Sequence, residues 1–215
     1  AFEALLPGLK DKDARVRRAV VSALGNIKTK ASYKAIKPIA EKGDPSYLVE
    51  SAAIQGLAAI ASTTIQESAK DEKKIIKLLK SILEERQGWN EVIRSGAITG
   101  LSKLRTSEAA LDLVLKYTSE GTPQALRLAS IRALGAIASG QSALNLERIL
   151  NRLEELSAET FFLTQVAVVM ALGRMETVKA VGILQALADQ TPDGRVRRRA
   201  VEAIQKVRKS VGSDV

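Results

Sequence analysis

The sequence predicts an all-α protein in which pairs of helices repeat along the chain. Apolar residues make up 46% of the chain but aromatic residues only 3%, so Ala, Leu, Ile and Val have to form the core. Ala and Leu favour helices, whereas a core of packed strands normally carries more aromatic side chains. A helical pattern of apolar and small residues also recurs six times, which is the mark of a repeat architecture.

The first copy of the pattern occupies residues 16–27. Its apolar or small residues lie on one helix face, at Val16, Val20, Ala23, Leu24 and Ile27. The six copies begin at positions 16, 49, 93, 126, 164 and 196, which gives steps of 33, 44, 33, 38 and 32 residues. A variable period with a small residue beside a Leu is typical of HEAT and armadillo repeats. The sequence therefore predicts a HEAT-like α-α superhelix (solenoid) of about six helix pairs.

Each copy is expected to contain an outer helix, a turn and an inner helix that carries the pattern. The first outer helix is shortened, and the other five are predicted at residues 32–41, 72–86, 108–119, 145–157 and 177–190. Turns rich in Gly, Asp, Asn and Pro precede the inner helices at residues 11–13, 43–45, 88–90, 121–123 and 192–194, with a weaker turn at 158–160.

No shift in composition divides the chain. Residues 62–71 are the longest irregular piece; they account for the step of 44 and are predicted to be an insertion. Residues 1–215 are therefore predicted to form a single solenoid. Because the chain opens in mid-pattern as AFEALLPGLK without Met, we expect it to be a C-terminal fragment of a larger protein.

The composition argues against catalysis by this chain. The sequence has no His and no Cys, which removes the commonest general base, the commonest zinc ligand and any thiolate chemistry. No paired carboxylates, P-loop or GxSxG motif is present. There is also no long apolar run and no signal-peptide pattern. We expect a chain without catalytic residues, metal, cofactor or membrane partner, located in the cytoplasm.

One polar position of the repeat supplies most of the candidate binding residues. It is occupied by Arg17, Glu50, Arg94, Arg127, Gln165 and Arg197. One interpretation is a charged ladder along the inner helices that binds an acidic partner. The favoured one is a set of structural ties, such as Asp13 with Arg17 and Asp193 with Arg197 at a spacing of four. The exposed turns add two aromatic candidates, Tyr47 and Trp89, whereas Phe161 and Phe162 are expected to fill the core.

The charge of 33 − 24 = +9 permits attraction to nucleic acid, to an anionic membrane or to an acidic protein. Two basic clusters, at residues 15–18 and 195–199, fall in the first and last copies, while the middle copies are mixed in charge. A nucleic-acid groove would be basic along its length and carry stacking aromatics. The sequence therefore disfavours nucleic acid and favours solvated end surfaces.

Three turn sequences resemble a known family. Residues 43–50 (GDPSYLVE), 88–96 (GWNEVIRSG) and 191–199 (TPDGRVRRR) resemble the C-terminal HEAT region of bacterial members of the aminopeptidase N family of zinc gluzincins. The first turn is also similar to a transcription-initiation factor subunit of the same architecture. The aminopeptidase resemblance implies a non-catalytic domain that packs against an upstream catalytic domain and restricts the access of peptide substrates. The zinc and the HExxH and GxMEN motifs would belong to that upstream domain.

Two other functions stay open beside this one. The chain could be a free-standing HEAT-repeat scaffold for protein–protein interaction. It could also be a HEAT module for nucleic acid, in which only Trp89 is available as the aromatic residue beside a flipped base. A lyase of the same class is a weaker option, because only carboxylates could supply its chemistry.

Overall fold

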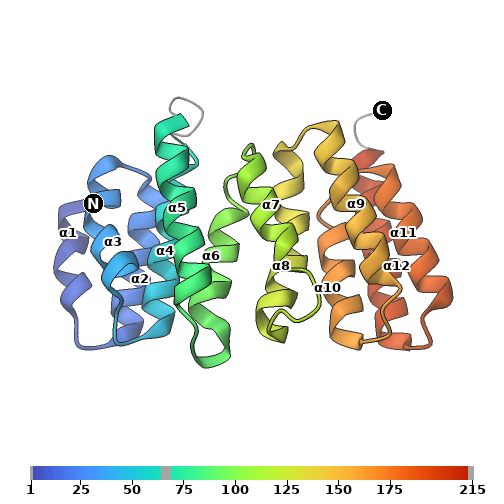
Figure 1. Cartoon of the computed structure of the whole chain (residues 1–215), viewed down its shortest axis with the longest axis horizontal. Coiled ribbons are helices and arrows are strands. Elements are labelled where there is room, and N and C mark those ends of the chain that lie inside the picture. Colours follow the sequence, from blue (N-terminus) through green and yellow to red (C-terminus); the bar gives the residue numbers. More distant parts are fainter. Residues whose placement is uncertain (1, 64–68, 213–215) are drawn as a thin grey trace. The chain divides into compact units, whose positions relative to one another are not determined.

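The computed structural model describes residues 2–63 and 69–212, and within these ranges every regular element is helical. The elements are α1 (Phe2–Leu5), η1 (Leu6–Lys10), α2 (Ala14–Ile27), α3 (Lys30–Lys42), α4 (Tyr47–Ala61), α5 (Ala69–Glu85), η2 (Trp89–Glu91), α6 (Val92–Leu101), α7 (Glu108–Lys116), α8 (Gln124–Ile137), η3 (Ala138–Gly140), α9 (Ala143–Ser157), α10 (Phe162–Leu172), α11 (Val178–Gln190) and α12 (Gly194–Val211). The all-α prediction is confirmed (Figure 1).

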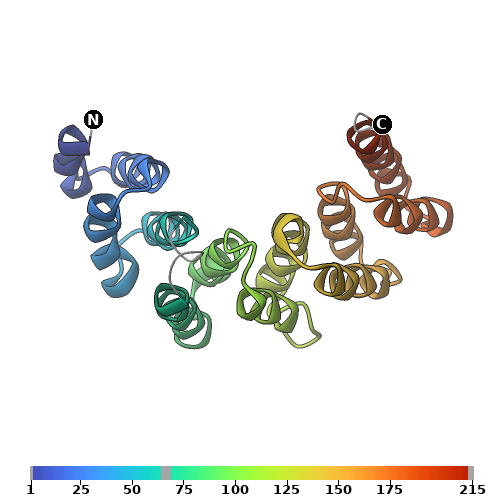
Figure 2. The same cartoon turned by 90° about the horizontal axis from the view of Figure 1, so that it is seen from above.

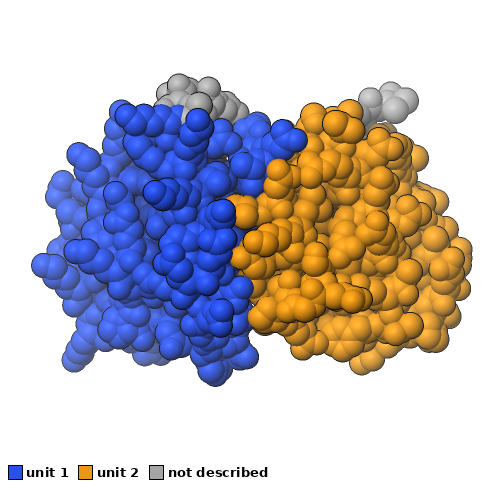
Figure 3. Space-filling model, viewed as in Figure 1, with its two compact units in different colours: residues 1–110 blue, residues 111–215 orange. Residues whose placement is uncertain are grey.

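The chain divides into two compact units, residues 1–110 and 111–215 (Figure 3). In unit 1, α2 packs on α4 and α4 on α6, while α3 packs on α4 and α5 on α6. In unit 2, α8 packs on α10 and α10 on α12, while α9 packs on α10 and α11 on α12. Each unit therefore has two layers of helices, which are seen end-on in Figure 2. We call α2, α4, α6, α8, α10 and α12 the inner helices and α1, α3, α5, α7, α9 and α11 the outer helices.

The core of each unit follows the repeat register. The residue eight positions after each leading position is buried in all six copies, with at most 5% of its surface exposed: Leu24, Leu57, Leu101, Leu134, Leu172 and Ile204. The leading positions are buried too, except Val16, which is 40% exposed. Val16 belongs to the first copy, whose outer helix is reduced to α1 and η1.

Small residues let the inner helices approach closely. A Cβ added to Gly25 of α2 would lie 2.9 Å from the Cα of Gly56 in α4, and one added to Gly135 of α8 would overlap the backbone of Ala171 in α10. These contacts explain why a small residue stands beside the buried Leu in the repeat.

Five outer helices lie where the sequence places them, to within three residues at each end. Two expectations need correction. The predicted insertion at 62–71 is too long, because α4 continues to Ala61 and α5 begins at Ala69; residues 64–68 lie outside the described residues. Phe161 does not fill the core: it precedes α10 and is 46% exposed, while Phe162 lies beneath the Arg195 guanidinium, 4.2 Å from the ring centre.

Candidate functional site

The repeated polar position of α2 carries Arg17, which reaches the turn of the next copy. Its Nε and Nη2 donate to the two carboxylate oxygens of Asp44 at 3.0 and 2.8 Å, and its Nη1 donates to the carbonyl of Asp11 at 2.9 Å. Burial alone would raise the pKa of Asp44, but hydrogen bonds from Arg17 and from the Ser46 amide lower it below its usual value. Arg17 is therefore a tie between two copies.

The predicted pairing of Asp13 with Arg17 is wrong. The carboxylate of Asp13 instead accepts from the backbone N–H of Arg15 at 2.8 Å, which caps α2, and forms an ion pair with the Arg15 guanidinium. The same correction applies to Asp193 and Arg197: Asp193 caps α12 and pairs with Arg195, while Arg197 donates to the carbonyl oxygens of Ala188 and Thr191. In both turns the capping role takes the Asp side chain away from the expected partner.

In unit 2 the same position ties α8 and α10 to the turns that follow them. Arg127 donates to both carboxylate oxygens of Glu159, at 2.9 and 2.6 Å, and to the carbonyl of Thr118 at 2.7 Å. The Arg127 guanidinium lowers the pKa of Glu159. Gln165 accepts a hydrogen bond from the Thr191 hydroxyl at 3.1 Å.

In α4 and α6 the position is buried and its partners are different. Glu50 accepts from Arg86 at 2.8 Å, and Arg86 also donates to the carbonyl of Glu41. Burial outweighs the attraction of Arg86 and raises the pKa of Glu50 above its usual value. Arg94 pairs with Glu91 at 2.9 Å. The structure thus places all these side chains in intramolecular contacts, in line with the structural-tie interpretation; a binding role for them stays a prediction.

The two aromatic candidates are exposed in unit 1. Tyr47 is the first residue of α4 and is 45% exposed, and Trp89 lies in η2 and is 68% exposed.

Charge is divided unevenly between the two kinds of helix. Of the 24 acidic residues, only Glu50 and Glu202 lie on inner helices; α2, α6, α8 and α10 have none. The outer helices carry acidic residues at 3, 41, 71, 72, 84, 85, 108, 112, 147, 154, 155 and 189. The mixed charge of the middle copies therefore comes from their outer helices and turns.

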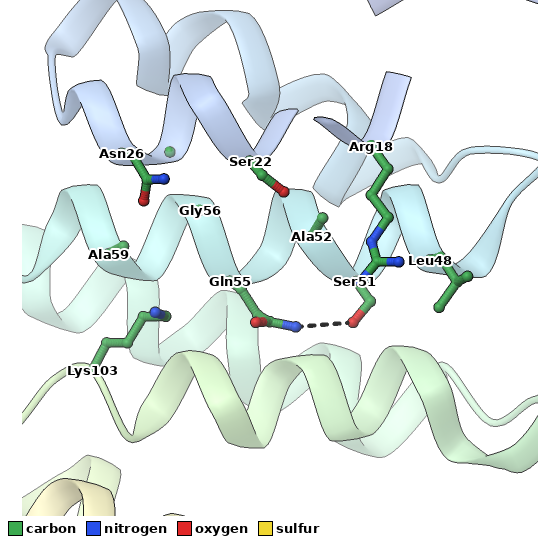
Figure 4. A pocket seen from close by; sticks show the side chains of 11 residues that line it. Arg18, Ser22, Asn26, Leu48, Ser51, Ala52, Gln55, Gly56, Ala59 and Lys103 are labelled. Atoms are coloured by element: carbon green, nitrogen blue, oxygen red, sulfur yellow. Dashed lines mark hydrogen bonds between the residues drawn. The ribbon is translucent and has the colours of Figure 1, made fainter. Parts of the chain in front are cut away.

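A pocket of about 170 Å³ opens on the inner helices of unit 1 (Figure 4). Cations lie at its two ends: Lys103, just after α6, at the end where Ala59 and Asn26 lie, and Arg18 of α2 near Leu48. The rest of the lining is small or uncharged: Ser22, Gly25, Ser51, Ala52, Gln55, Gly56 and Ala59. Inside the pocket the Gln55 amide donates to the Ser51 hydroxyl at 3.2 Å. Among the described residues, no carboxylate lines it.

The surroundings of Lys103 disfavour its charged form. Burial lowers the pKa of Lys103, and the nearby charges of Lys28 and Arg105 lower it further. In unit 2 the pKa of Arg132, on α8, is lowered in the same way by burial and by Arg174. Among the described residues neither Lys103 nor Arg132 has an ion-pair partner.

The sequence prediction missed this pocket. Arg18, Ser22 and Asn26 lie four residues apart on one face of α2, which the sequence does reveal. That Lys103 joins this face depends on the stacking of α2, α4 and α6.

No group of three or more potential metal ligands occurs among the described residues, and none of the helices seen there is long and apolar enough to cross a membrane.

The fold defines an all-helical repeat protein of the HEAT and armadillo type. Residues 2–89 match a family model described as HEAT repeats. The structure is similar to an engineered protein solved by the Northeast Structural Genomics Consortium, with a TM-score of 0.52, 20% identity and 97% of both chains covered.

Two designed armadillo repeat proteins are also similar in structure. For one the TM-score is 0.51 at 16% identity, with 96% of this chain and 100% of that chain covered. The other, in complex with the peptide (KR)4, has a TM-score of 0.52 at 15% identity, with 96% and 99% covered. At these identities the likeness concerns the fold alone. No curated protein matches the sequence, and nothing in these matches points to an aminopeptidase.

Proposed function

We propose that this chain is a non-catalytic binding scaffold whose inner helices hold an acidic segment of a partner protein. The observation that supports this is the near absence of carboxylates from the inner helices, set against twelve on the outer helices. An acidic segment on that surface meets cations and few like charges, and complementary potentials favour both encounter and specificity.

Two groups of cations lie on the inner helices or just after them. The arginines of the repeated polar position, such as Arg17 and Arg127, already pair with Asp44 and Glu159, so their charge is largely neutralised within the fold. A second group, on the inner helices or just after them, has no ion pair within the described residues; it includes Arg18 and Lys103 in unit 1 and Arg132 and Arg174 in unit 2. In each unit these are the cations that can attract a partner.

Peptide binding has a precedent in this fold, since the similar designed armadillo repeat protein is in complex with (KR)4. The charge here favours the opposite kind of peptide. Nucleic acid shares the required charge, but aromatic side chains on or next to the inner helices are few: Tyr47, Trp89 and Phe161 are exposed, and Phe162 is covered by Arg195.

The test measures fluorescence anisotropy of labelled probes at physiological salt. The probes are a 20-residue peptide of alternating Glu and Gly, its Gln counterpart, and a single-stranded DNA of equal charge. We expect the Glu peptide to bind more than about tenfold tighter than the Gln peptide and tighter than the DNA. Equal binding of the Glu and Gln peptides would reject the acidic partner, and a clear preference for the DNA would support a nucleic-acid module.

The second candidate is the accessory domain of a zinc aminopeptidase, with the upstream catalytic domain and its peptide substrate as partners. It is supported by the turn sequences alone, and the contact of Asp44 with Arg17 gives one of those turns a structural explanation. Sequencing the native reading frame upstream of Ala1 decides the matter. An in-frame HExxH with a distant Glu would support the accessory domain, whereas a start codon just before Ala1 would leave the scaffold.

A further inference from the structure

We propose that the pocket of unit 1 is a recognition site for two carboxylate side chains of an extended peptide, with Lys103 and Arg18 each binding one of them. This inference rests on the proposed scaffold function and specifies where, and through which side chains, the acidic segment binds. The anchors are two cations at opposite ends of one elongated pocket, whose described lining residues include no carboxylate (Figure 4).

The length of the pocket sets the spacing of the acidic residues. Arg18 and Asn26 both line the pocket and stand eight residues apart on α2, which corresponds to about 12 Å along the helix. An extended peptide advances about 3.3 Å per residue, and its side chains alternate between faces. Acidic side chains at positions i and i+4 of such a peptide lie on one face about 13 Å apart. Because Lys103 lies at the same end of the pocket as Asn26 (Figure 4), such a pair of acidic side chains matches the length of the pocket between Arg18 and Lys103.

The middle of the pocket suits a main chain better than a further charge. Ser22, Ser51, Gln55 and Asn26 present hydroxyl and amide groups, which can both donate to carbonyl groups and accept from N–H groups. The small residues between them leave the 170 Å³ open, whereas a single water needs only about 10–15 Å³. The pocket has room for part of a peptide.

The environment of Lys103 explains why an anion is the favoured occupant. A half-buried ammonium beside Lys28 has lost part of its hydration without gaining a counter-charge from the described residues, and burial has lowered its pKa accordingly. A carboxylate would supply a charge-assisted hydrogen bond there. Arg18 is exposed, and its planar guanidinium can bind a carboxylate through two parallel bonds.

The experiment uses the full chain and a fluorescein-labelled nonapeptide with Glu at positions 3 and 7 in a background of Ala and Gly. The pocket variants are Lys103→Met and Arg18→Gln. The control is Lys77→Met, which also removes one positive charge but lies on the exposed surface of α5. We expect each pocket variant to weaken binding about tenfold, and Lys77→Met to weaken it less than about twofold. Lys103→Arg, which keeps the charge, should retain most of the affinity.

A second peptide, with one Glu replaced by Gln, tests the pairing. It should lose its sensitivity to one of the two pocket variants and keep its sensitivity to the other. Circular dichroism melts ensure that only folded variants are compared.

The outcomes separate the pocket from the scaffold function. Equal small losses for Arg18→Gln, Lys103→Met and Lys77→Met would overturn the pocket and leave a scaffold that binds through net charge. Binding of the longer Glu–Gly peptide with no binding of the nonapeptide would overturn the pocket alone. Failure of both acidic peptides to bind would overturn the pocket and the acidic-partner function together.

Discussion

Residues at one repeat position have different partners because the turns that face them differ. Arg17 meets a carboxylate, Asp44, in the following turn, whereas Arg197 meets only the carbonyl oxygens of Ala188 and Thr191. A guanidinium can satisfy its donors in either setting, but only the first gives an ion pair. The contribution of this position to the free energy of unfolding therefore differs from copy to copy.

Arg127→Met should destabilise the protein by about 1–2 kcal/mol, because it removes a two-bond contact with Glu159 whose partners are partly exposed and partly screened. Urea unfolding followed by circular dichroism gives the difference. The matched change Arg198→Met breaks an exposed pair with Glu202 at 4.0 Å and should cost less than about 0.5 kcal/mol. Equal losses for the two variants would show that Arg127 contributes no more than a surface pair.

The same pair has a pH dependence of known sign. Arg127 lowers the pKa of Glu159 from 4.5, so the unfolded chain binds more protons there and the stabilisation is complete only above pH 4.5. It is lost as the pH falls through the lowered folded-state pKa. The difference between wild type and Arg127→Met should therefore shrink on acidification below pH 4.5.

Lys103→Met should raise the melting temperature at pH 7. The pKa of Lys103 is lowered from 10.5 in the folded state, so the unfolded chain binds more protons in the window between the lowered value and 10.5, and stability rises with pH across it. Below that window Lys103 is charged in both states, so the folded state bears the full cost of burying its ammonium group. Methionine removes that cost. The gain over wild type should shrink as the pH approaches 10.5. A lower melting temperature for Lys103→Met at pH 7 would show that its charge is stabilising in the unbound protein.

The sequence could predict the positions of these residues better than their partners. The repeat register puts Arg17 and Arg127 at one place because a helix pattern is local. Their partners are 27 and 32 residues away, in turns brought near by stacking, so a rule for neighbours on one helix finds Asp13 and misses Asp44. Lys103 was missed for the same reason, since it follows α6 and faces residues of α2 and α4.

At the scale of elements, local signals place helices well and their ends less well. The outer helix predicted at 145–157 is found at Ala143–Ser157, with Ser142 as its cap. The one predicted at 108–119 ends at Lys116, because the N–H groups of Thr118 and Ser119 donate to the carbonyl oxygens of Leu115 and Lys116, three residues back, as in a turn. Phe161 was misplaced because apolar character alone does not show which side of a helix start a side chain faces.

Close packing between inner helices predicts a contrast between two glycines of unit 2. Gly135→Ala should destabilise the protein by at least about 1–3 kcal/mol, because the new Cβ would overlap the backbone of Ala171. Backbone atoms, unlike a side chain, cannot rotate away. Gly182→Ala, within α11, meets nothing within 4 Å and should stabilise by about 0.5–1 kcal/mol through helix propensity. Thermal or urea unfolding of both variants measures the contrast. A neutral Gly135→Ala would contradict the close approach of α8 and α10.

At the scale of the whole molecule, the net charge of +9 does not show how unevenly the acidic residues are distributed. The inner helices carry two acidic residues and the rest of the chain carries 22 (24 − 2). The partner surface is therefore better described by the charge of one layer than by the charge of the chain. A binding reaction governed by that layer should depend on which lysine is removed as well as on how many are removed.

The repeat register also predicts that residues 1–215 behave as one array. The step from Ile93 to Leu126, which crosses from unit 1 into unit 2, is 33 residues, the same as from Val16 to Val49. In a stacked array each copy is stabilised by its neighbours, so stability is a sum of copy and nearest-neighbour contributions. A fragment of residues 1–106 should keep its helical circular dichroism, melt at a lower temperature than the full chain, and still bind the two-Glu nonapeptide through Arg18 and Lys103. The opposite outcome is a full chain that melts in two transitions, one of them at the melting temperature of the fragment. That outcome would make the two units independent domains.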